Sequence, residues 1–214
     1  MTRAATLAGL TLFVAACAAC AAGASPTVPA ASGDVSTPDD NAARTYCTDK
    51  GGMLVDRVAT WNTNADKAAW LELAGRMTFC EFQTGDGGEG TTRISVDLTT
   101  LYSEQPTLAA IAYLSKVGPT VPPNPGQNPG AYNCNTGLGG SGTFGNTSAG
   151  GGWVDASQEI FVVMDMCFFA DGSAIDEFGI FYYANDTIRG ADLAPILRYQ
   201  PGDRLPAMFE EPRR

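Results

Sequence analysis

The sequence predicts an α+β fold made of two similar small modules, each a short antiparallel β-meander with a short helix, stapled by a disulfide. Four cysteines beyond the N-terminal segment form two pairs with equal spacing. Cys47 to Cys80 spans 33 residues, and so does Cys134 to Cys167. In both halves, runs with strand composition lead through glycine-containing turn signals into a helical pattern. The 214 residues suffice for one large domain or two small ones.

Residues 1–16 have the features of a signal peptide. Arg3 supplies the positive start, and an apolar run covers residues 4–16. The sequence "VAAC" then ends at Cys17, which we expect to carry a lipid and to become the mature N-terminus. Cleavage after a later alanine and a weakly apolar membrane anchor are the alternatives. Residues 17–40, rich in Ala, Ser, Pro and Thr, are expected to form a flexible tether.

The first module is expected to span residues 41–118. Its strands are "RMTFCEF" at 76–82 and "TRISVDL" at 92–98, joined by a long glycine-rich loop. A helix is expected to begin at Pro106, because proline is well tolerated in the first helical turn. The prolines of residues 119–127 remove backbone donors, so this segment is predicted to be a semi-rigid linker.

The second module is expected at residues 128–200, with a C-terminal tail at 201–214. A β-rich run at 160–169 leads into Asp171-Gly172, a dipeptide that favours a hairpin turn. Residues 174–183 are predicted as the return strand and residues 187–190 as a short third strand. A helix over residues 192–199 follows, with Asp192 as its cap and Pro195 in its first turn.

The order of shared features indicates a diverged tandem duplication. Asn41 and Asn128 each lie six residues before the first cysteine of a pair, and a tyrosine and a glycine pair flank each of these cysteines. "CEF" at 80–82 matches "CFF" at 167–169, and "TLAAIAY" matches "DLAPILRY". Four cysteines allow three connectivities. The equal spacing favours Cys47–Cys80 and Cys134–Cys167.

The composition excludes several classes of function. The chain has no histidine, which excludes Ser-His-Asp and Cys-His catalytic pairs and histidine-ligated metal sites. Its net charge of −10 opposes binding to nucleic acid. The motifs "GDGGEG" and "GSGTFG" lack the strand and helix that a dinucleotide site requires. We therefore expect no catalytic residues, no cofactor and no metal.

A weak candidate binding surface lies in and after "CFFADGSAIDEFG" at 167–179. Its members are Asp171, Asp176, Glu177, Phe178 and Tyr182. On the predicted strand, the neighbours Asp176 and Glu177 point to opposite faces and do not form a carboxylate pair. Turn and strand residues beside an aromatic core are the simpler interpretation. A polar site beside an aromatic ligand platform is the alternative.

The second module resembles a bacterial family of small exported proteins that carries a hemolysin label and is formally a domain of unknown function. The residues that match the family pattern are Asn128, Pro129, Cys134, Gly139, Gly140, Cys167, Phe169, Asp171, Gly172, Ser173 and Glu177. Phe178 stands where the family has tryptophan, and the loop between the cysteines is longer. The first module fits only the first half of the pattern. The resemblance covers most of residues 41–199 and implies no catalytic residues.

Three functions remain open at this point. The first is an exported, lipid-anchored cell-envelope protein, periplasmic or on the outer surface, with a non-enzymatic binding or structural module. Its partners would be the membrane, through the lipid, and an envelope protein or glycan. The second is a carboxylate-dependent hydrolase of envelope glycans, which needs two carboxylates about 5 to 9.5 Å apart in a groove. The third is a membrane-active protein, as the hemolysin label implies.

Overall fold

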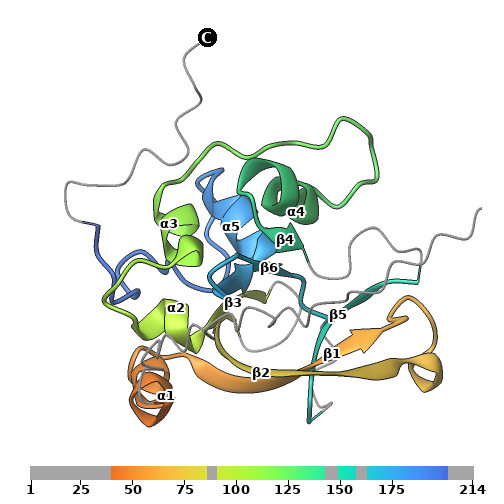
Figure 1. Ribbon diagram of the computed structural model, residues 1–214, viewed down its shortest axis with the longest axis horizontal. Helices are drawn as coiled ribbons and strands as arrows, with labels where there is room; N and C mark the ends of the chain where they lie inside the picture. Colours follow the sequence, from red (N-terminus) through yellow and green to blue (C-terminus); the bar gives the residue numbers. More distant parts are fainter. Residues whose placement is uncertain (1–39, 86–90, 143–148, 158–162, 202–214) are drawn as a thin grey trace, which may run out of the picture. The chain divides into compact units, whose positions relative to one another are not determined.

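A curled antiparallel sheet of seven strands forms the centre of the structure, with short helices packed against it (Figure 1). The computed structural model describes residues 40–85, 91–142, 149–157 and 163–201. The predicted signal peptide, Cys17 and residues 18–39 of the predicted tether lie outside these residues, as does the tail from residue 202. The mixed architecture agrees with the predicted α+β class.

The two halves of the chain contribute elements in a similar order. The first half supplies α1 (Asp40–Asp49), β1 (Met53–Trp61), η1 (Lys67–Ala69), β2 (Leu71–Thr84), β3 (Thr92–Asp97), α2 (Leu98–Tyr102) and α3 (Leu108–Leu114). The second half supplies α4 (Pro129–Tyr132), η2 (Asn133–Gly137), β4 (Ser141–Gly142), β5 (Gly151–Asp155), β6 (Met166–Phe168), β7 (Ala174–Asp176) and α5 (Glu177–Tyr183). The strand order in the sheet is β4-β6-β7-β3-β2-β1-β5.

Strands from both halves share this one sheet. β3 pairs with β7 at Val96 and Ile175, and β5 pairs with β1, where Trp153 lies opposite Ala59. The sequence predicts two meanders, one in each module. The observed sheet joins them, because the last strand of each meander pairs with the last strand of the other.

Both disulfides have the predicted pairing and nearly the same surroundings. The Cα–Cα distances are 5.8 Å for Cys47–Cys80 and 5.7 Å for Cys134–Cys167. The N–H of Gly52 donates to the carbonyl of Cys47, and the N–H of Gly140 donates to the carbonyl of Cys134, both at 2.9 Å. A Cβ at either glycine would lie 2.4 or 2.5 Å from a disulfide sulfur. The second glycine of each pair is therefore required by the close approach of the backbone to its disulfide.

The strand registers around the two disulfides also match. The paired residues are Leu54–Cys80 and Cys80–Val96 in the first half, and Gly142–Cys167 and Cys167–Ile175 in the second. Val96 and Ile175 then pair with each other. Asp97 and Asp176 come directly after these two residues and cap α2 and α5. The halves thus meet through the strands that lie beside Cys80 and Cys167.

A hydrophobic cluster lies on each face of the sheet. Cys80 belongs to the larger cluster, which contains both disulfides and buried residues of α2, α3 and α5. Its neighbour Phe79 points to the opposite face. There it joins the smaller cluster with Trp153 and Met166. Two stacked rings, Tyr113 of α3 and Tyr183 of α5, have centroids 4.0 Å apart and hold these helices together.

The predicted return strand over residues 174–183 is wrong after Asp176. β7 ends at that residue, and Glu177–Tyr183 is helix α5. The Asp176 carboxylate accepts the N–H of Gly179 at 2.7 Å, which makes Asp176 the N-cap. Gly179, Ile180 and Tyr183 are buried. They lie three, four and seven residues after Asp176, which is the spacing of one helix face. The same segment also fits the alternation of a strand, so the sequence pattern is ambiguous.

Four other predicted elements differ from the observed structure in type or extent. Residues 187–190 form no strand, and the N–H of Gly190 donates to the side-chain hydroxyl of Thr92 in β3 rather than to the backbone of a strand. Residues 192–199 form turns rather than a helix. Helix α3 begins at Leu108, because Thr107 rather than Pro106 marks its start as the N-cap. Of the strand predicted at 160–169, β6 forms only residues 166–168, and residues 160–162 lie outside the described residues.

Candidate functional site

Three carboxylates gather where α4 and α5 meet the β6–β7 hairpin. Asp176 and Glu177 are 3% and 1% exposed, and Asp165 is partly buried. The N–H of Glu177 donates to the carbonyl of Asp165 at 3.0 Å. The negative charge of Asp165 contributes to raising the pKa of both Asp176 and Glu177. The prediction that Asp176 and Glu177 point to opposite faces of a strand is therefore wrong, because Glu177 opens a helix.

Glu177 has one bonded oxygen and one without a partner. The Nδ2 of Asn128 donates to Oε1 at 2.9 Å, whereas Oε2 has no hydrogen-bond partner among the described residues. A Cβ at Gly142 would lie 3.0 Å from this oxygen. Burial, followed by the charge of Asp165, raises the pKa of Glu177 to about 8. The carboxyl group is therefore mostly protonated at neutral pH.

Asp176 and Asp165 are also easier to protonate than ordinary aspartates. Burial raises the pKa of Asp176 to about 7, although the N–H of Gly179 and the charge of Arg189 favour the ionised form. Burial raises the pKa of Asp165 to about 6, and a hydrogen bond from Asn128 opposes this rise. The cluster therefore changes its charge over the range from mildly acidic to mildly alkaline pH.

Asp171 lies apart from this cluster and contacts the first half of the chain. Its Oδ2 accepts the N–H of Leu108 at 2.7 Å, and the hydroxyl of Ser173 accepts the N–H of Ala109 at 3.0 Å. Burial raises the pKa of Asp171, but hydrogen bonds from Ser173 and Leu108 outweigh it and leave the pKa below the usual value. The turn that carries the Asp-Gly-Ser string therefore supplies acceptors to the start of α3.

Phe178 and Tyr182 form the aromatic part of the predicted surface. Their ring centroids are 6.4 Å apart. The guanidinium of Arg189 lies 5.8 Å from the Phe178 ring and 5.3 Å from the Tyr182 ring. Tyr182 is 37% exposed. The two rings thus have a cationic partner within the chain, and they share helix α5 with Glu177 but not its buried surroundings.

Sequence reasoning missed Asp165 and the role of Asn128. The available signal is the Asn128-Pro129 dipeptide, which is typical of an N-cap followed by the first helical residue. The structure shows this cap, since Oδ1 of Asn128 accepts the N–H of Ala131 at 3.1 Å. Its amide group also reaches Glu177 and Asp165, contacts that depend on how α4 packs and leave no local pattern.

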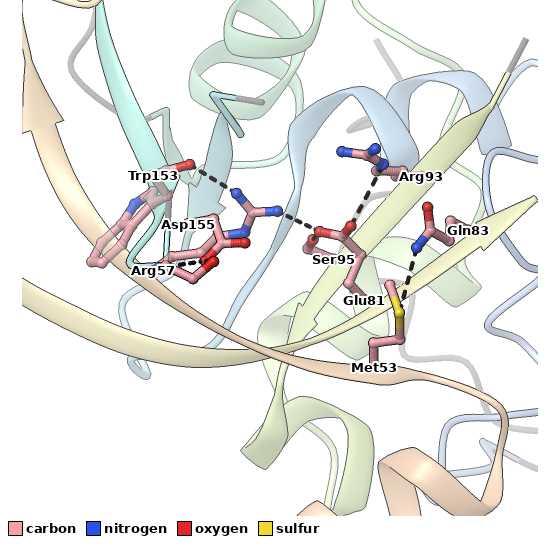
Figure 2. A network of polar contacts seen from close by, with 9 residues as sticks. Met53, Arg57, Glu81, Gln83, Arg93, Ser95, Trp153 and Asp155 are labelled. Atoms are coloured by element: carbon pink, nitrogen blue, oxygen red, sulfur yellow. Dashed lines mark hydrogen bonds and ion pairs between the residues drawn. The ribbon is translucent and has the colours of Figure 1, made fainter. Parts of the chain in front are cut away.

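A second buried polar cluster, also missed, lies within the sheet (Figure 2). Arg57 of β1 donates to Glu81 of β2 at 2.5 Å, and neither side chain is exposed. Arg57 also donates to the carbonyl of Trp153 at 3.1 Å, and the hydroxyl of Ser95 donates to Glu81 at 3.1 Å. Arg93 approaches the other oxygen of Glu81 at 3.6 Å. This network ties together four strands, β5, β1, β2 and β3.

Asp165, Asp176 and Glu177 form what we call the acid cluster, and its raised pKa values give it the protonation state that a proton donor needs. A protonated carboxyl group with a free oxygen can donate to a bound ligand. The described residues contain no group of three His, Cys, Asp or Glu side chains arranged to hold a metal. The cavities beside β1, β2 and α1 are not bordered by Asp165, Asp176 or Glu177. In the part of the chain that the structure describes, no helix is long and apolar enough to cross a bilayer.

Comparison with known proteins adds no family assignment. No family model matches the chain, and neither the curated proteins nor the solved structures yield a match. The site must therefore be interpreted from its own geometry. The two disulfides indicate a domain that folds in an oxidising, extracytoplasmic compartment.

Proposed function

We propose that the chain is an exported, lipid-anchored cell-envelope protein whose disulfide-closed domain is a non-enzymatic binding or structural module. The non-enzymatic role is supported by one observation: two of the candidate acids form hydrogen bonds that stabilise the fold. Asp171 accepts the first N–H of α3, and Asp176 caps α5. Both roles stabilise helix starts, because the N–H groups there lack partners within the helix.

Membrane fractionation of a variant tests the proposed lipid anchor at Cys17. Cys17→Ser removes the only side chain in "VAAC" that can take a thioether-linked lipid. We expect the full-length variant to leave the membrane fraction, while the wild type stays in it. Cys20→Ser is the matched control, since it removes a nearby cysteine outside the motif. A Cys17→Ser variant that remains as membrane-bound as the wild type would exclude the lipoprotein interpretation.

A carboxylate hydrolase is the second candidate, and one observation favours it. Glu177 is protonated at neutral pH, retains a free oxygen and lies near Asp165, whose pKa is lower. A protonated acid beside a more acidic carboxylate is the division of roles that glycoside hydrolysis requires. The burial of Glu177 argues against this candidate, because a substrate must reach the acid.

We also propose that the two halves descend from a tandem duplication and that both belong to the hemolysin-labelled domain family. The matched glycine contacts at Gly52 and Gly140 support the duplication, as do the equivalent registers at Cys80 and Cys167. The hemolysin label itself implies an attack on membranes. A liposome-leakage assay with the full-length protein tests that implication, and we expect no leakage.

A further inference from the structure

Three hollows border successive stretches of β1 and β2, from the end near η1 to the end near α1. Their volumes are about 120, 320 and 220 Å³. Polar or aromatic side chains border each of them: Thr60, Lys67, Trp70 and Glu72 the first, Asp56, Arg76 and Thr78 the second, and Asp40, Arg44 and Thr78 the third.

The strand register places Asp56, Thr60 and their partners on β2 on one face of the sheet. Asp56 and Thr60 of β1 point to the same side because they are separated by an even number of residues. Asp56 pairs with Thr78, and Thr60 pairs with Glu72. The second and third hollows share Thr78. The four-residue step from Asp56 to Thr60 covers about 13 Å, at roughly 3.3 Å per residue. The row therefore suits an elongated ligand better than a single small molecule.

The lining carries charges of both signs in similar numbers. Three basic and three acidic side chains that are not buried border the three hollows, whereas the whole chain has a net charge of −10. Some of the polar groups are already oriented. Nη2 of Arg44 donates to the hydroxyl of Thr78 at 2.8 Å, and that hydroxyl lies 2.5 Å from a carboxylate oxygen of Asp56. Such a surface offers donors and acceptors to a ligand that has many polar groups and little net charge.

An aromatic ring stands at one end of the row. Nε1 of Trp70 donates to the carbonyl of Ala65 at 2.9 Å, which fixes the orientation of the indole. The ring is partly exposed and lines the first hollow. A fixed aromatic face can pack against the C–H face of a sugar ring, while the flanking polar groups bond its hydroxyls. An extended peptide would instead be recognised through backbone bonds at a strand edge.

We infer that this face of the β1–β2–β5 ribbon binds a glycan, an extended polysaccharide without a large net charge. The inference rests on the proposed binding function and adds the class of partner. The ring of Trp70 would hold one sugar, and the polar side chains that are not buried, from Glu72 to Arg44, would bond the hydroxyls of the sugars that follow.

The test is sedimentation of the full-length chain with three insoluble glycans, namely chitin, cellulose and purified bacterial sacculi. Trp70→Ala removes the ring, and Arg76→Gln removes one charge from a side chain that is 63% exposed. Phe181→Ala is the matched control, because it removes a partly exposed aromatic ring from α5, outside the row. We expect at least one glycan to retain the wild type and the control. Trp70→Ala should bind roughly tenfold more weakly and Arg76→Gln a few-fold more weakly.

The other outcomes separate this inference from the proposed function. If the glycans retain the Trp70→Ala variant as well as the control, the chain binds glycans but the ribbon face is not the site. If no glycan retains the wild type, the glycan inference is overturned, and a binding function toward an envelope protein still stands. Release of soluble sugar by the wild type would contradict the non-enzymatic function itself.

Discussion

At the scale of residues, the structure uses buried charge in two different ways. Arg57 and Glu81 form an ion pair at 2.5 Å with both side chains fully buried. Glu177, in contrast, is buried beside other acids, so protonation rather than a basic partner removes its charge. The first arrangement needs both partners present. The second makes stability depend on pH.

Arg57→Met should destabilise the domain by about 3 kcal/mol, because it leaves the buried charge of Glu81 without its main partner. Arg76→Met is the matched control. Arg76 pairs with Glu72 at 3.3 Å on the surface, where such a pair contributes less than about 1 kcal/mol. Denaturant unfolding of both variants measures the difference. Equal losses in the two variants would show that the buried pair has no special role.

The free energy of unfolding should fall as pH rises from about 4.5 to 8. Glu177 has its ordinary pKa of 4.5 when unfolded and about 8 when folded, so the folded state binds more protons across this window. Stability is therefore highest below the unfolded pKa and is lost by the time pH exceeds the folded pKa. Glu177→Gln removes this titration and should reduce the decline by more than about 1 kcal/mol. Urea unfolding at pH 5, 7 and 8.5 checks it, and parallel curves for variant and wild type would contradict it.

At the scale of elements, sequence patterns predict an element correctly where residues close together in the chain determine it. The equal cysteine spacing predicts both disulfides, and the Asp171-Gly172 turn joins β6 to β7 as expected. The prediction fails for α5, since strand alternation and helical spacing fit residues 174–183 equally well. The cap formed by Asp176 is the feature that decides for the helix.

The candidate site is predicted less well than the fold, for a physical reason. Asp176 and Glu177 are found from sequence because they are adjacent in a distinctive string. Asp165 and Asn128 join them only through the packing of α4 against α5, which the sequence pattern does not encode. The same holds for Arg57 and Glu81, which are brought together by the pairing of long strands.

Gly140→Ala tests the close packing of the Cys134–Cys167 disulfide against the second glycine of its pair. The new Cβ would lie 2.5 Å from the sulfur of Cys167, so we expect a loss of about 1 to 3 kcal/mol from overpacking. Gly52→Ala should behave alike, since its Cβ would lie 2.4 Å from the sulfur of Cys80. At Gly118 an added Cβ meets nothing within 4 Å, which makes Gly118→Ala the control. Thermal unfolding ranks the three, and an unaffected Gly140→Ala variant would refute the packing argument.

At the scale of the whole molecule, stability and the proposed function occupy largely different regions. The disulfides and the acid cluster lie where the two halves meet, whereas Arg57 of the buried network borders the second hollow. The row of hollows lies along β1 and β2, and its side chains come from segments that are distant in sequence. Substitutions in the acid cluster should therefore change stability and leave ligand binding intact.

The most direct test of the non-enzymatic account is a turnover assay with the Asp176→Asn/Glu177→Gln double variant. Both substitutions keep the shape of the side chains, and asparagine remains a good N-cap for α5. Full-length wild type and double variant are incubated with peptidoglycan, ester and glycoside substrates, and released products are measured. We predict no turnover by either protein and only a modest difference in unfolding free energy. Turnover by the wild type that disappears in the folded double variant would contradict the account and establish a carboxylate hydrolase.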